Sequence, residues 1–76
     1  MSNEKFSPLE VAELRSEVLQ NQLDARDAAE LMQSFLIGRG YGVSPEAARA
    51  AAFAITGSGC SLEVMQRELN RIAMVQ

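Results

Sequence analysis

The stretch EAARAAAFAIT, Glu46 to Thr56, decides the expected fold. Within it, only Glu46 and Arg49 carry a charge, and most of the remaining residues are alanine. A helix that is apolar on nearly every side is usually buried, and small side chains let neighbouring helices approach closely. We therefore expect this segment to form the central helix of the domain.

Helix-start signals divide the rest of the chain around this segment. Ser44-Pro45 opens the central helix in the same way as Ser7-Pro8 opens an earlier one, because serine caps free amides and proline suits the first turn. Glu10 completes a capping box with the first serine. Asp24 and Ser61 are the expected caps of the other two helices. The expected helices span residues 8–22, 25–37, 45–56 and 61–74.

Helix ends and strand patterns complete the expected architecture. Gly38 should end the second helix in the left-handed conformation, and Gly57 should end the central one. No segment alternates polar and apolar residues over the length of a strand, so no sheet is expected. The sequence predicts a single compact all-α domain of four helices over residues 1–76, with bundle-like or orthogonal packing and flexible residues at 1–5.

Length and composition limit the possible functions. The 76 residues carry a net charge of −3, one cysteine and no histidine. A chain of this length buries only about 60% of its unfolded surface, so a partner or a second copy would add stabilising burial. The sequence has no apolar run of membrane-spanning length, and the stretch MSNEKFSPLE lacks the basic start and apolar centre expected of a signal peptide. A lone cysteine forms no internal disulfide, which favours a reducing, cytoplasmic location.

The sequence contains no recognisable catalytic or metal-binding pattern. Without histidine, Cys60 cannot form a Cys–His pair within the chain, and one cysteine does not make a typical zinc site. Cys60 is interpreted as a small apolar packing residue before the last helix. We expect no enzymatic activity and no cofactor.

The turn GRGYGVSP, residues 38–45, allows two interpretations. Its glycine spacing does not match a phosphate-binding loop, no lysine follows, and a helix precedes it instead of a strand. It is read first as a helix stop, a turn and a cap. As a recognition corner, it would project Arg39 and Tyr41, because exposed arginine and tyrosine are common interface anchors. Tyr41 could equally tuck its ring under the third helix with its hydroxyl at the surface.

Glu10, Glu13 and Glu17 form an acidic row along one side of the first helix. Such a row is read first as a solvated face, because charges on exposed helical faces usually serve solubility. If it has a function, we expect it to be a docking face for a basic partner.

Arg67 and Arg71 lie one turn apart on the last helix. They too are read first as a solvated face. In the sharper interpretation they belong to the recognition helix of a helix-turn-helix protein that binds DNA. Glu63 and Glu68 on the same helix, together with the acidic net charge, argue against nucleic acid as the partner.

A further pattern spans residues 28–73. A Gly-aromatic pair follows one helix, the next helix is rich in alanine and ends near Thr-Gly, and a final helix follows. The residues concerned are Gly40-Tyr41, Ala48, Ala52, Phe53, Thr56-Gly57 and Leu62-Glu63-Val64. The pattern resembles a ubiquitin-associated-type three-helix module, although Arg39 stands where that family usually has methionine. The resemblance implies a peptide- or protein-binding surface formed by the Tyr41 corner and the last helix.

These observations favour a small, non-enzymatic interaction or regulatory protein that binds another protein, or itself as a homodimer. A DNA-binding regulator and a ubiquitin-associated-like module remain alternatives, and no membrane partner is expected. The candidate contact residues are Arg39, Tyr41, Arg67, Arg71, Glu10, Glu13 and Glu17.

Overall fold

The computed structural model describes residues 6–56 and 60–75 of the chain. Four helices make up most of this part, which confirms the expected all-α class. Their bounds are Pro8–Gln20 (α1), Ala25–Ile37 (α2), Pro45–Ile55 (α3) and Leu62–Ile72 (α4). The predicted flexibility of residues 1–5 and the predicted helix stop at Gly57 lie outside the described residues.

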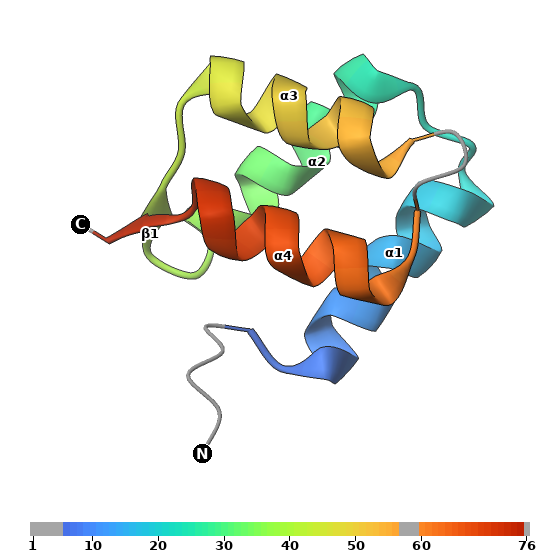
Figure 1. Ribbon diagram of the computed structural model, residues 1–76, viewed down its shortest axis with the longest axis horizontal. Helices are drawn as coiled ribbons and strands as arrows, with labels where there is room; N and C mark the ends of the chain where they lie inside the picture. The colour runs from blue at the N-terminus through green and yellow to red at the C-terminus, as the bar shows by residue number, and fades with distance from the viewer. Residues whose placement is uncertain (1–5, 57–59, 76) are drawn as a thin grey trace.

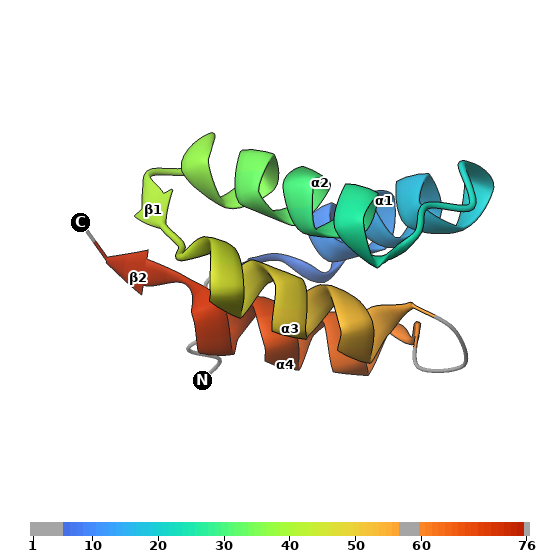
Figure 2. The same cartoon turned by 90° about the horizontal axis from the view of Figure 1, so that it is seen from above.

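The helices form two layers (Figures 1 and 2). One layer contains the antiparallel pair α1 and α2, and the other contains the antiparallel pair α3 and α4. Contacts of α2 with α3 and of α1 with α4 join the layers, and the core lies between them. The largest fully buried side chains are Phe6, Val11, Met32, Leu36, Ile55, Met65 and Leu69.

All four helix starts have the expected caps. The side chains of Ser7, Asp24, Ser44 and Ser61 each accept a hydrogen bond from the backbone N–H three residues later. At Ser7 the capping box is complete, because Glu10 Oε2 also accepts the Ser7 N–H at 2.9 Å. A cap of this kind stabilises a helix by about 1 kcal/mol, so local chemistry accounts for where each helix begins.

Three helices end earlier than expected. The first stops at Gln20 because the chain turns at Gln22, where φ is 50°. The third ends at Ile55, with Thr56 as its cap, which is one residue short of the prediction. The last ends at Ile72, because the backbone becomes extended at Ala73.

The expectation that the chain has no sheet is wrong, because two short strands pair with each other. Tyr41–Gly42 (β1) and Met74–Val75 (β2) pair antiparallel (Figure 2). Each strand has two residues, which is too few to show the alternation by which strands are recognised in a sequence. The pair attaches the segment after α4 to the turn between α2 and α3.

The turn after α2 uses a different glycine from the one predicted. Gly38 keeps a right-handed conformation, with φ −63° and ψ −16°, whereas Gly40 has φ 85°. The Gly40 N–H donates to the Ile37 carbonyl at 3.1 Å, so the chain winds for several residues beyond the helix before it reverses. Positive φ favours glycine because it has no Cβ atom, so the left-handed position lies two residues later than expected.

The central position of α3 is confirmed in part. This helix contacts both α2 and α4. Ala48, Ala51 and Ala52 are completely buried on its inner side. It is not buried all round, however, because its outer side faces solvent and Phe53 is 67% exposed there. The two neighbouring helices cover only one side of α3. An apolar composition does not by itself bring another element against the other side.

Candidate functional site

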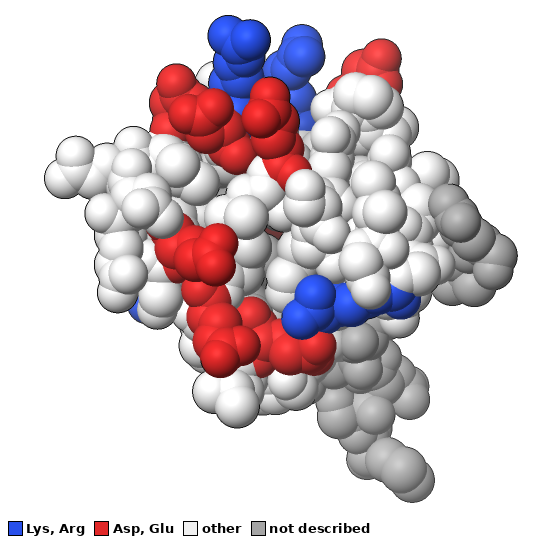
Figure 3. All heavy atoms as spheres, turned by 180° about the vertical axis from the view of Figure 1, so that it is seen from behind, with Lys and Arg blue, Asp and Glu red and all other residues white. Residues whose placement is uncertain are grey.

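A groove of about 340 Å³ separates α1 from α2 on the face opposite to that shown in Figure 1. Acidic side chains gather on this face (Figure 3). The groove arises because residues three and four apart lie on the same side of a helix, so each helix contributes a row of side chains to one wall. Its lining consists of Glu10, Glu13, Leu14 and Glu17 from α1, with Leu31, Ser34, Phe35 and Arg39 from α2 and the following turn.

The floor of the groove is apolar. Leu14 is buried, and Leu31 and Phe35 are half-buried beside it. The Phe35 ring packs against that of Phe6, with the two centroids 5.5 Å apart. Gln66 on α4 holds the Phe6 segment in place by donating a hydrogen bond to the Phe6 carbonyl at 2.9 Å. The floor is thus continuous with the core beneath it.

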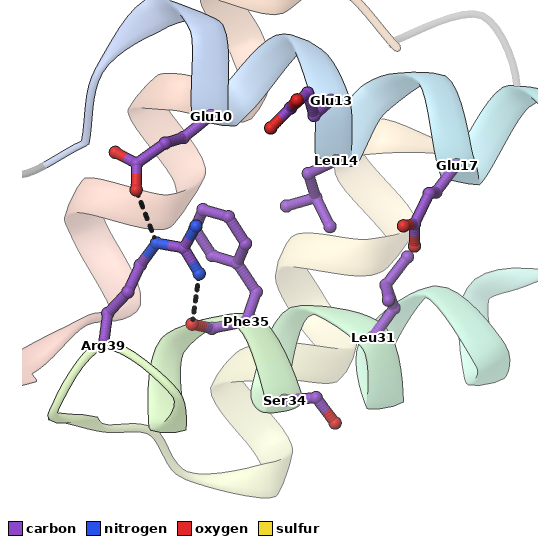
Figure 4. Close-up of a pocket in the computed structure, with 8 residues that line it drawn as sticks. All are labelled: Glu10, Glu13, Leu14, Glu17, Leu31, Ser34, Phe35 and Arg39. Carbon is purple, nitrogen blue, oxygen red and sulfur yellow. Dashed lines mark hydrogen bonds and ion pairs between the residues drawn. The ribbon is translucent and has the colours of Figure 1, made fainter.

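Arg39 closes one end of the groove (Figure 4). Its Nε donates to Glu10 Oε1 at 2.8 Å, and its Nη1 donates to the Phe35 carbonyl at 3.3 Å. The guanidinium carbon lies 3.8 Å from the centroid of the Phe35 ring. Arg39 therefore joins α1 to the end of α2, and much of its side chain is engaged within its own chain.

The three carboxylates of the acidic row have different environments. Both oxygens of Glu10 are engaged, one by the Ser7 N–H and the other by Arg39. These contacts, the backbone hydrogen bond first and the guanidinium second, lower the pKa of Glu10 below its ordinary value of 4.5. Glu13 and Glu17 are exposed at the rim, and within residues 6–56 and 60–75 their carboxylates form no hydrogen bond or ion pair. The row thus divides into one carboxylate with a structural role and two that face solvent.

Tyr41 does not project from the turn. It is half-buried, and its ring meets that of Phe6 nearly edge-on, with the centroids 5.4 Å apart and the planes at 63°. The aromatic partner is therefore the residue that precedes the Ser7 cap, and Phe6 lies between Tyr41 and Phe35. The alanine-rich α3 begins four residues after Tyr41. Because the Tyr41 ring contacts the buried Phe6 ring, it stabilises the turn between α2 and α3 from its inner side.

The two arginines of α4 are not equivalent. Arg71 pairs with Glu68, with Nη2 and Oε1 2.5 Å apart, and this carboxylate is almost completely buried. Arg67 is exposed. Because α4 belongs to the layer opposite to the groove, these arginines are not brought together with the acidic row. In the sequence, Glu68 counted only as a charge that argues against nucleic-acid binding, and the arginine three residues later is the local signal of its ion pair.

Cys60 lies in a second, smaller depression. It is half-buried, packs against the core and lines a cavity of about 300 Å³ with residues that include Val18 and Ile55. Its backbone carbonyl accepts a hydrogen bond from Arg15 Nε at 2.9 Å. The packing role expected from the sequence accounts for these contacts.

Comparisons of the chain with protein-family models, with curated proteins and with solved structures gave no significant match. Among the described residues, no helix has both the length and the apolar character needed to cross a membrane. The geometry of the groove is therefore the observation from which a function is inferred.

Proposed function

We propose that this protein is a small, non-enzymatic interaction protein that binds a protein partner in the groove between α1 and α2. One observation carries this proposal. The groove combines a half-buried apolar floor at Leu31 and Phe35 with two solvent-facing carboxylates, Glu13 and Glu17, on one rim. Binding sites are typically concave and mostly apolar, with a few polar groups that fix the orientation of the ligand. This surface is concave, and it has an apolar floor with polar groups along its walls.

The same arrangement favours binding over catalysis. Two carboxylates act as an acid and a base when their environments separate their pKa values. Glu13 and Glu17 instead extend from one helix, one turn apart, at an exposed rim. Their arrangement suits recognition of a charged surface better than proton transfer.

The two alternatives from the sequence analysis have less support. In a helix-turn-helix the two helices cross at about 90–120°, whereas α3 and α4 lie side by side and antiparallel (Figures 1 and 2). The ubiquitin-associated-like surface depends on an exposed Tyr41 corner, and Tyr41 instead packs against Phe6. Both observations favour the groove between α1 and α2 over these two alternatives.

Site-specific photo-crosslinking tests the proposed function. A photoreactive side chain replaces Ser34, which is exposed and lines the groove, and in a matched control it replaces Ala50, which is exposed on the outer side of α3. In cells, the Ser34 variant should form a covalent adduct of defined mass with another protein, and the Ala50 variant should not. Equal labelling from both positions, or no adduct from Ser34, would contradict the proposal.

Self-association through α3 is a second candidate function, and the exposure of Phe53 favours it. This ring is 67% exposed and lies among exposed alanines, Ala50 and Ala54. A small domain gains burial by sharing such a face with a second copy across a two-fold axis. Sedimentation analysis should then show a dimer that Phe53→Ser converts to a monomer. A wild-type protein that remains monomeric at high concentration would exclude this candidate.

A further inference from the structure

We propose that the groove binds a basic amphipathic helix of the partner, with two arginine or lysine side chains four residues apart and apolar side chains beside them. The inference rests on the proposed function and adds the chemical class of the occupant. Charge complementarity is the main argument, because the open rim carries only the carboxylates of Glu13 and Glu17 among its lining charges.

The spacing of these carboxylates favours a helix as the occupant. Glu13 and Glu17 are four residues apart on α1, which corresponds to about 6 Å along the helix axis. Basic residues four apart on a partner helix have the same repeat. A helix that lies along α1 would therefore place both cations opposite both carboxylates at the same time. An extended segment has a similar repeat, because its residues i and i+2 lie about 6.6 Å apart on one face, but the residues between them point to the opposite face. A helix instead presents an apolar row beside its basic row, as the apolar floor beside the two carboxylates requires.

The closed end of the groove shows that its walls accept a guanidinium. Arg39 lies against Phe35 on one side and against the Glu10 carboxylate on the other, at 3.8 Å and 2.8 Å respectively. At the open end, Leu31 and Glu17 stand in the corresponding places on the two helices (Figure 4). A cation of the partner would meet a carboxylate from α1 there, and an apolar side chain of the partner would cover Leu31.

The length of the open groove limits the contact. The walls are two helices of 13 residues each, and Arg39 occupies one end. What remains is the stretch beside Glu13 and Glu17, which a partner helix of about three turns would cover, given the helical pitch of about 5.4 Å. The net charge of −3 adds a weaker, long-range attraction for a basic partner.

The test uses a synthetic alanine-based helical peptide with arginine at positions i and i+4 and leucine at i+3 and i+7. Fluorescence anisotropy at low ionic strength measures its binding to the wild-type protein. The double variant Glu13→Gln with Glu17→Gln should bind about tenfold more weakly, because two exposed charge pairs are lost. A matched variant, Glu46→Gln with Glu63→Gln, makes the same change in net charge at exposed positions of α3 and α4, in the layer opposite to the groove, and should weaken binding by less than about twofold. Helical circular dichroism confirms that both variants fold.

A composition-matched peptide decides whether the spacing matters. In this control the arginines stand at i and i+2, which places them on opposite sides of the helix. Equal binding of the two peptides would overturn the inference, as would equal weakening by the two double variants. If neither peptide binds while the Ser34 crosslink still captures a protein, the basic-helix occupant is wrong and the proposed function stands. If the crosslink also fails, both are wrong.

Discussion

Both layers of this molecule are antiparallel helix pairs, but the side chains between their helices and the neighbouring elements pack differently. On α3, which contacts both α2 and α4, the inner side is completely buried at Ala48, Ala51 and Ala52. In the layer of α1 and α2, a groove of about 340 Å³ separates the helices. Small side chains let backbones approach closely, whereas the rows facing the groove carry glutamate, leucine and phenylalanine. The size and charge of the side chains therefore account for the close packing around α3 and for the groove between α1 and α2.

Added bulk should have its largest effect on the closed interface. We expect Ala52→Leu to lower the free energy of unfolding by about 2 to 3 kcal/mol, because the added atoms have no space in a packed core. Ser34→Leu adds bulk to the exposed wall of the groove and should change the free energy of unfolding by less than about 0.5 kcal/mol. Denaturation in urea, followed by circular dichroism, measures both changes. Similar losses in the two variants would show that the layers are equally packed.

Loss of the Arg39 contacts at the end of the groove should have an intermediate effect on the free energy of unfolding. Arg39→Ala removes the ion pair with Glu10 and the contact with the Phe35 ring. The expected loss in unfolding free energy is about 1 kcal/mol, because both side chains of the pair are about one-third exposed, at 35% and 36%, and water screens their attraction. Arg67→Ala is the matched control on the other layer. An equal loss in the control would contradict a specific role for Arg39.

The smallest expected effect concerns pH. The pKa of Glu10 is lowered in the folded state by the Ser7 N–H and by Arg39. A carboxyl group with a lowered folded pKa stabilises the fold above its unfolded pKa, and this contribution is lost as the pH falls through the folded value. Unfolding free energies measured from neutral pH down to below 4.5, the ordinary value for this group, should therefore decline less steeply for Glu10→Gln than for the wild type. Identical slopes would show that these contacts do not stabilise the ionised form.

Much of the fold could be predicted from the sequence because helix starts depend on local contacts. A cap joins residues only three positions apart, as in the hydrogen bond from the Glu10 N–H to Ser7 Oγ at 3.2 Å. All four predicted caps are present for this reason. Helix ends were predicted less well. The segment after Ile72 pairs with Tyr41–Gly42, and α3 and α4 lie between these two segments in the sequence. No short-range pattern contains that information.

The features of the candidate site also divide into those that follow from local sequence and those that depend on distant contacts. Helical periodicity alone places Glu10, Glu13 and Glu17 on one side of α1, so the sequence by itself determined the acidic rim. Only the tertiary structure decided that Glu10 is engaged by Arg39, 29 residues away, and that an apolar floor lies beside the other two. The physical reason is one of range. Caps and helix faces follow from interactions within a turn or two, whereas the width of a groove depends on every side chain packed between two helices.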